Sequence, residues 1–307
     1  MSGPAYRSLV ESGALERRAE AALELLQPCR VCPRRCGAER LAGAEGACRT
    51  GRLVAVAAHF PHHGEEDCLR GSRGSGTIFF CGCNLLCPFC QNWETSHECE
   101  GEPLSAERLA EMMLELEAAG CHNINWVTPT HVVPQALEAL AIAARAGLSL
   151  PIVYNSGGYD AVETLRLLEG VVDIYMPDFK FWDAAAAGRI LGVPDYPEAA
   201  RRAIREMHRQ VGDLVIDGRG LATRGLLVRH LVLPNGVAGT PQVAAWLASE
   251  ISQDTFLNVM PQYRPAGLVA APAGRARFAE LARPIEREEF FEAVAAARAA
   301  GLRRFAR

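Results

Sequence analysis

Residues 76–92 read Gly-Thr-Ile-Phe-Phe-Cys-Gly-Cys-Asn-Leu-Leu-Cys-Pro-Phe-Cys-Gln-Asn and join a short apolar segment to a dense group of cysteines. Thr77–Phe80 is a β-branched and aromatic run of the kind that forms a buried strand. Three of the cysteines, Cys83, Cys87 and Cys90, have the spacing C-x3-C-x2-C. Thiolates at this density select zinc or an iron–sulfur cluster, and a [4Fe–4S] cluster normally takes four cysteines. Three cysteines on one loop would leave one iron of such a cluster without a protein ligand. The alternative is a structural zinc site that uses the same three cysteines together with Cys81.

The loop resembles the signature of the radical S-adenosylmethionine (SAM) enzymes, in which SAM chelates the open iron. Phe89 before the third cysteine and Asn92 after it also match that signature. The order Cys-Asn-Leu-x-Cys-x-Phe-Cys-Gln-Asn is most similar to relatives of the pyruvate formate-lyase activating enzyme. The resemblance implies a [4Fe–4S] cluster on the three cysteines and reductive cleavage of SAM to a 5′-deoxyadenosyl radical, which abstracts a hydrogen from the substrate. It also implies an electron donor such as flavodoxin or ferredoxin, and a glycyl radical enzyme as the partner that is activated.

Composition and charge narrow the class of protein. The 307 residues are enough for one large α/β domain with a small appendage. The net charge of −4 differs from the basic excess of a general nucleic-acid binder. No apolar run approaches the roughly 20 residues that span a bilayer, and the N-terminus lacks the features of a signal peptide. We therefore predict a cytoplasmic protein with no nucleic-acid or membrane partner, whose cysteines are not a disulfide framework.

A second group of cysteines precedes the first. Cys29, Cys32, Cys36 and Cys48 lie in a segment rich in glycine and arginine. C-x2-C pairs bind metals well because a tight turn directs both sulfurs to one side. Zinc, a second iron–sulfur cluster and thiols without a metal are all open interpretations. This four-cysteine leader resembles that of one subgroup of activase-like proteins. We predict an N-terminal helix and Cys-rich leader over residues 1–70 and a radical SAM domain over residues 71–307.

From residue 77 onward, six apolar runs alternate with helical patterns. The predicted strands are Thr77–Phe80, Asn123–Val127, Ile152–Tyr154, Val171–Met176, Leu226–Leu233 and Phe256–Met260. Such alternation predicts parallel strands with right-handed crossovers. A complete barrel needs eight units. The resemblance therefore implies an α/β fold that is a partial (β/α)6 TIM-like barrel, with an N-terminal Cys-rich extension and the cluster at its C-terminal mouth.

In barrel-like folds the functional residues gather at the C-terminal ends of the strands. The segment after the second strand holds Thr128 where many relatives have glycines and an acid that contact the amino group of SAM. His131, in the same segment, is either an acid or base of the pocket or a plain loop histidine. After the third strand, Asn155 and Ser156 look like the residues that contact the ribose, and Gly157 and Gly158 look like glycines that let the ligand approach closely.

The last two predicted contacts are charged. Asp178 and Lys180 project to the same side of an extended segment, and together they match the motif with which glycyl-radical-enzyme activases hold SAM. Arg229 lies in an apolar strand and needs a partner if it is buried, for which the carboxylate or ribose of SAM is the candidate. Two other functions stay open: a radical SAM enzyme that modifies a small molecule or a peptide side chain, and a non-catalytic zinc or iron–sulfur binding module.

Overall fold

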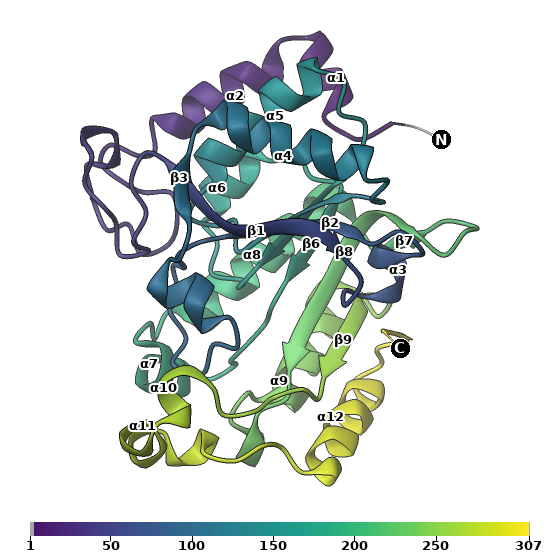
Figure 1. Ribbon diagram of the computed structural model, residues 1–307. Coiled ribbons are helices and arrows are strands. Elements are labelled where there is room, and N and C mark those ends of the chain that lie inside the picture. Colours follow the sequence, from purple (N-terminus) through teal and green to yellow (C-terminus); the bar gives the residue numbers. More distant parts are fainter. Residues whose placement is uncertain (1–2, 307) are drawn as a thin grey trace.

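The computed structural model describes residues 3–306, and its centre is one ten-stranded sheet (Figure 1). The six predicted strands are neighbours in chain order, and each pair is parallel. They are β2 (Ser75–Phe80), β4 (Ile124–Val127), β5 (Ile152–Ser156), β6 (Ile174–Pro177), β8 (Ala222–Leu231) and β9 (Phe256–Met260). The prediction of an α/β partial barrel is confirmed. The sheet of residues 3–306 is not closed, because β3 and β10 form its two ends.

The register of the sheet brings the ends of its strands to one edge. Val127 of β4 pairs with Phe79 of β2 on one side and with Asn155 of β5 on the other. Ser156 then pairs with Pro177 of β6, and a bridge joins Asp178 to β8. Residues that follow different strands in the sequence are therefore neighbours in space at this edge.

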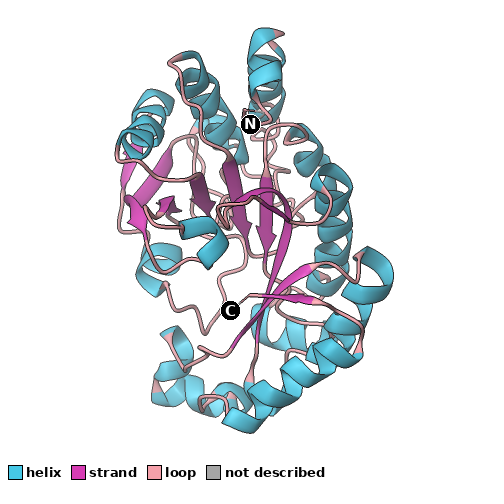
Figure 2. Ribbon diagram, turned by 90° about the vertical axis from the view of Figure 1, so that its right-hand side faces the viewer, coloured by secondary structure: helices cyan, strands magenta, loops and turns pink. Residues whose placement is uncertain are grey.

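Helices cover the outer side of the sheet (Figure 2). They include α4 (Ala106–Ala118), α5 (Val133–Arg145), α6 (Val162–Leu167), α7 (Ala184–Leu191), α8 (Tyr196–Val211), α9 (Thr240–Trp246) and α12 (Arg287–Ala299). The short helices α10 (Gly267–Ala270) and α11 (Pro272–Arg277) follow β9 and lie apart from this layer, at the lower left of Figure 1. α4 shows why these segments are helical. Ser105 caps it by accepting a hydrogen bond from the backbone N–H of Arg108, and the periodic apolar residues Leu109, Met113 and Leu116 are buried.

The sequence did not predict four strands. These are β1 (Val54–His62), β3 (Glu102–Leu104), β7 (Val215–Ile216) and β10 (Arg304–Phe305). β1 adds to β2 in the antiparallel sense, so the strand that leads to the cysteine loop is an interior strand. Only Val54 and Val56 of β1 are buried, and the rest of the strand is half-buried or exposed. Because its outer half is not buried, the run has no regular apolar pattern and does not look like a core strand in the sequence.

A short helix fills the inside of the partial barrel. α3 (Asp67–Arg70) follows β1, and its residues Cys68 and Leu69 are buried. They pack in one apolar cluster with Ile174 of β6 and Leu227 of β8. Cys68 is thus a small apolar core residue.

The N-terminal segment packs on the helical layer. α1 (Arg7–Glu11) precedes α2 (Ala14–Leu23), which lies against α5 and buries Leu15, Ala19 and Ala22 (Figure 1). The backbone N–H of Ala5 donates to the buried carboxylate of Asp173 at 2.9 Å. The predicted division at residue 70 has β1 and α3 on its N-terminal side, and both belong to the sheet and its core. Within residues 3–306, no helix combines the length and apolar character needed to cross a membrane.

Candidate functional site

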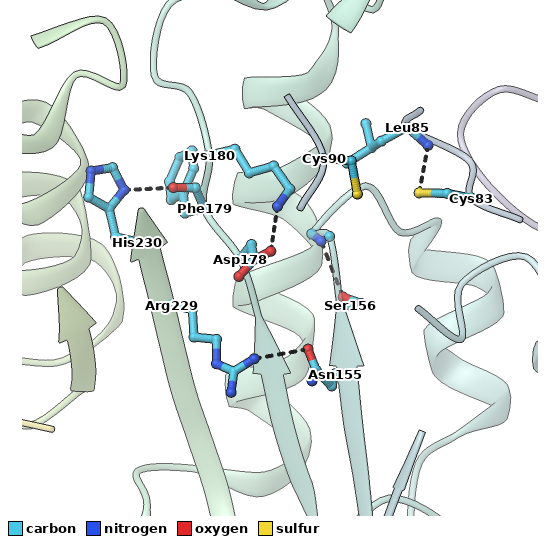
Figure 3. A network of polar contacts seen from close by, with 12 residues as sticks. Cys83, Leu85, Cys90, Asn155, Ser156, Asp178, Phe179, Lys180, Arg229 and His230 are labelled. Atoms are coloured by element: carbon cyan, nitrogen blue, oxygen red, sulfur yellow. Dashed lines mark hydrogen bonds and ion pairs between the residues drawn. The ribbon is translucent and has the colours of Figure 1, made fainter. Parts of the chain in front are cut away.

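The signature loop, which we define as residues 81–92, leaves the C-terminal end of β2. Cys83, Cys87 and Cys90 line a cavity of about 560 Å³ at this edge of the sheet. The backbone N–H of Leu85 donates to the sulfur of Cys83 at 3.3 Å (Figure 3). The hydroxyl of Ser96 donates to the sulfur of Cys90 at 3.2 Å. Hydrogen bonds directed at sulfur favour the thiolate form, which is the form that binds metals.

Burial raises the pKa of the Cys83 and Cys87 thiols, and the nearby charge of Lys180 opposes that rise. A metal that binds the sulfur displaces the thiol proton into solvent, so a metal centre here would form with release of protons. Within residues 3–306, no three His, Cys, Asp or Glu side chains already stand in the arrangement that would hold a single metal ion.

Asp178 and Lys180 face the same cavity from the segment after β6. The Lys180 ammonium contacts the Asp178 carboxylate at 2.5 Å, and both side chains are about four-fifths buried, at 18% and 21% exposure. Burial opposes the charge of Lys180, but the Asp178 carboxylate more than offsets it, so the net effect raises the pKa of Lys180. Figure 3 shows Lys180 between Asp178 and the signature loop. A charged pair of this kind suits a ligand that carries both an ammonium and a carboxylate.

The segment after β5 is built around a buried carboxylate that the sequence did not indicate. Asp160 accepts hydrogen bonds from Thr130 at 2.7 Å, from Tyr154 at 2.8 Å and from Ser156 at 2.7 Å. Burial raises the pKa of Asp160, and the three hydrogen bonds oppose the rise. Ser156 therefore uses its proton internally and offers the cavity only an acceptor.

The glycines after Ser156 have a different role from the one expected. The sequence suggested that Gly157 and Gly158 let a ligand approach closely. A Cβ on Gly158, whose φ is +78°, would lie 2.1 Å from the carbonyl oxygen of Asp178, and one on Gly157 would lie 2.8 Å from the side chain of Leu85. Both contacts are with protein atoms, so these glycines pack the β5 and β6 ends against each other and against the signature loop.

Arg229 finds its partners inside the protein. Its guanidinium donates to both oxygens of Glu66 at 2.7 Å and to the carboxylate of Glu65, and it lies 3.5 Å from the amide oxygen of Asn155. Asn258 of β9 also donates to Glu66 at 2.7 Å. Burial raises the pKa of both glutamates and the Arg229 charge lowers it. The net effect lowers the pKa of Glu66 to about 2 and raises the pKa of Glu65.

These two glutamates link the ends of the open sheet. Glu65 and Glu66 follow β1, which lies near one end of the strand order, whereas Arg229 and Asn258 are on β8 and β9 near the other end. We call this group the Glu–Arg clasp: Glu65, Glu66, Arg229 and Asn258. An acidic run such as residues 65–67 usually lies in a polar surface loop, but the side chains of Glu65 and Glu66 are only 6% and 4% exposed.

The remaining predicted site residues divide between the cavity and the core. Asn92 and Thr128 line the cavity, and Thr128 adopts the left-handed conformation with φ of +61°. Phe89 is buried beneath the loop, where its ring packs edge-on against Phe181 and Tyr263. His131 faces away from this cavity and lines a second one.

The second cavity lies within the leader, here residues 29–52. Cys29, Cys32, Cys36 and Cys48 line it together with Arg34, Arg40, Asn84 and His131. Cys36 is exposed and the other three thiols are buried. Burial raises the pKa of Cys32 to about 12 and also raises that of Cys48. For Cys36 burial acts in the same direction, but hydrogen bonds from the backbone of Ala38 and Ala47 prevail and lower its pKa.

The leader contacts the back of the signature loop directly. A Cβ on Gly82, with φ of +79°, would lie 2.3 Å from the carbonyl oxygen of Cys48. The guanidinium of Arg34 donates to the carbonyl oxygens of Asn84 and Leu85, the latter at 3.5 Å. The two cavities that are lined by cysteines thus lie on either side of the signature loop.

Comparison with known proteins places this architecture in a family. The model of the radical SAM superfamily matches residues 77–218. An uncharacterized protein of Methanocaldococcus jannaschii is 31% identical over 265 residues, which cover 83% of this chain and 72% of that protein. A radical SAM methyltransferase from Sphaerobacter thermophilus has a TM-score of 0.48 and 15% identity over 84% of this chain and 78% of that one. The chain therefore carries a radical SAM superfamily domain over residues 77–218.

Proposed function

We propose that this protein is an enzyme that uses a [4Fe–4S] cluster on Cys83, Cys87 and Cys90 to cleave SAM and to abstract a hydrogen atom from its substrate. When bound, the cluster and SAM supply a 5′-deoxyadenosyl radical. The single observation that carries the proposal is that the three thiols and the Asp178–Lys180 pair line one cavity. Three thiols leave one iron without a protein ligand, and the charged pair offers complementary partners for an amino acid.

The protein residues orient SAM and exclude water. Lys180 would donate to the carboxylate of SAM, and Asp178 would accept from its ammonium. Ser156 offers a lone pair to a sugar hydroxyl because Asp160 already takes its proton, and the amide of Asn155 offers a donor. The cavity is therefore polar at the places where the polar ends of SAM would bind, and the cofactor supplies the chemistry.

Asn92, Thr128 and Arg229 complete the proposed SAM site. Asn92 lies at the end of the signature loop, and Thr128 presents a hydroxyl and a backbone carbonyl beside it. Arg229 would act through Asn155, because its guanidinium is already engaged by two carboxylates. Phe89 would support the loop from below, since it is buried against other aromatic rings.

The test is anaerobic reconstitution with iron and sulfide, reduction with dithionite, and electron paramagnetic resonance with and without SAM. We expect about four irons at the signature loop and a reduced-cluster signal that changes when SAM is added. Replacing Cys83, Cys87 and Cys90 by alanine should abolish SAM cleavage, whereas Cys121→Ala, a buried cysteine at the other end of β4, should not. A cluster signal that does not respond to SAM would contradict the proposal.

The substrate that the activase-like motif favours is a glycine in the backbone of a partner glycyl radical enzyme. The support is the match of Asp178 and Lys180 to the SAM-binding motif of such activases. Incubation of the reduced enzyme with SAM and candidate partners should then give the doublet of a glycyl radical. A one-electron donor such as flavodoxin or ferredoxin would replace dithionite in the cell.

A second candidate is a small molecule or a peptide side chain with polar or charged groups. The observation that favours it is the cavity wall formed by His62 and the Glu–Arg clasp. A backbone glycine brings no group that would use two buried carboxylates. For this candidate, 5′-deoxyadenosine should form with a metabolite in the absence of any partner protein, and Glu65→Gln should raise the KM for that metabolite.

We also infer that Cys29, Cys32, Cys36 and Cys48 hold a second metal centre. The support is their convergence on one cavity. Four thiols that line one cavity are a ligand set that suits zinc or an iron–sulfur cluster.

A further inference from the structure

Two buried histidines of the barrel differ in one respect. Both ring nitrogens of His230 have hydrogen-bond partners: Nδ1 has the carbonyl oxygen of Phe179 at 2.6 Å, and Nε2 has the hydroxyl of Thr240 at 2.8 Å. His131 is equally buried, at 1% exposure, but only its Nε2 is bonded, to the carbonyl oxygen of Cys81 at 2.8 Å. Its Nδ1 is buried without a partner. A buried polar atom without a partner is rare in folded proteins and destabilises them, so it calls for an explanation.

The hydrogen bond to Cys81 fixes which nitrogen is free. A carbonyl oxygen can only accept, so Nε2 of His131 carries the proton and Nδ1 of the neutral ring carries a lone pair. Histidines that bind metals commonly donate their other N–H to a backbone carbonyl in this way. The ring of His131 is therefore arranged as a metal ligand is.

A second atom without a partner lines the same cavity. Arg40 is fully buried, and its guanidinium donates to the carbonyl oxygens of Gly51 and His131 and approaches the sulfur of Cys29 at 3.7 Å. Its Nη2 has no partner, and no carboxylate within residues 3–306 forms an ion pair with it. A buried cation needs a compensating negative charge, and the leader thiols are the groups nearby that can supply one.

We propose that the leader cavity holds a metal centre of mixed ligation, in which Nδ1 of His131 takes the place of one of the four leader thiolates, the other three bind the metal, and Arg40 offsets the remaining negative charge. This deepens the proposed second metal centre and does not depend on SAM chemistry. Zn²⁺ and an oxidised [4Fe–4S] core both carry two positive charges. Four thiolates would leave such a core at −2, whereas three thiolates and one neutral imidazole leave −1, which Arg40 balances.

The ligand from the barrel ties the centre to the signature loop. The N–H of His131 holds the carbonyl of Cys81, the first residue of that loop, while Arg34 of the leader holds Asn84 and Leu85. Metal binding by His131 would therefore fix both ends of the segment that carries Cys83. Loss of the leader metal should weaken iron binding at the signature loop.

The test uses the full chain with Cys83, Cys87 and Cys90 replaced by alanine, so that metal at the leader is observed alone. Zinc, iron and sulfide are measured after anaerobic purification, and X-ray absorption at the edge of the metal found identifies its ligands. We expect sulfur and one nitrogen in the coordination shell. Zinc without sulfide identifies a single-ion site, and iron with equal sulfide identifies a cluster; either supports the proposal if nitrogen is present.

Variants of His131 in this background make the test specific. His131→Gln should remove the nitrogen signal and weaken metal binding about 10- to 100-fold in competition with a chelator. His131→Cys should restore binding with sulfur ligands alone, which shows that the fold tolerates a change at this position. His230→Gln is the matched buried control and should leave the metal in place. A coordination shell of sulfur alone in the parent would overturn the role of His131, and absence of any metal would overturn the leader centre itself, while neither result would touch the SAM proposal.

Discussion

Replacing Gly82 by alanine tests the contact between the leader and the signature loop. Gly82 has φ of +79°, and a Cβ there would lie 2.3 Å from the carbonyl oxygen of Cys48 and 3.0 Å from the hydroxyl of Thr50. Gly220 is a matched control, since its φ is +82° but nothing lies within 4 Å of its Cβ position. The left-handed conformation costs an alanine about 1–2 kcal/mol at either site. The overlap with Cys48 adds about 1–3 kcal/mol at Gly82 alone.

We therefore expect Gly220→Ala to lower the free energy of unfolding by about 1–2 kcal/mol and Gly82→Ala by about 2–5 kcal/mol. Effects on the unfolded chain are common to both substitutions and cancel in the comparison. Urea denaturation of the apoprotein gives the two values, and iron bound after reconstitution shows whether the loop is displaced. Equal losses of stability in the two variants, with equal iron, would refute the close contact.

Three further predictions concern charged groups. Lys180→Met removes a charge-assisted hydrogen bond worth about 1.5–3 kcal/mol, so the Kd for SAM should rise about 10- to 100-fold; an unchanged Kd in equilibrium dialysis would contradict the assigned role. Glu66→Gln breaks a buried ion pair with Arg229 and should lower the free energy of unfolding by about 3 kcal/mol. Glu198→Gln, which breaks a more exposed ion pair with Arg201, should lower it by less than about 1 kcal/mol. Similar losses in the two variants would argue against the clasp. Burial raises the pKa of Asp173 to about 6, so the folded state binds its proton more tightly than the unfolded state, and stability is lost as the pH rises through 6. Relative to Asp173→Asn, the wild type should gain up to about 3 kcal/mol between pH 7 and pH 4, and a difference that does not vary with pH would be inconsistent with this pKa.

The local pattern of apolar residues was sufficient to predict the strands at the core of the fold. Apolar runs such as Ile152–Tyr154 of β5 are buried along their whole length, so their hydrophobicity identifies them. Parallel topology then places the residues after each strand at one edge, which is why Asp178 and Asn155 could be predicted to lie together. Val54–His62 was missed because only its first residues enter the core and its outer half, which is half-buried or exposed, has no regular apolar pattern.

The Glu–Arg clasp and the position of His131 depend on contacts between distant segments. Glu65 and Glu66 belong to an acidic run that looks solvated, and their partner Arg229 is more than 160 residues away. The one local signal was an arginine within an apolar strand, which requires a carboxylate partner when it is buried. For His131 two interpretations were open from the sequence, and only the packing of the leader against the loop shows which cavity it lines.

The clasp also bears on how wide the mouth of this enzyme is. In a closed barrel the circumference is set by the number of strands and their stagger. Here the sheet is open, and the side chains of two glutamates, one arginine and one asparagine connect strands near its two ends. Rotation of these side chains can change the width of the opening while all hydrogen bonds between the strands stay intact. Substitutions at a few positions, without any change in strand number, would therefore be enough to fit the same scaffold to substrates of different bulk.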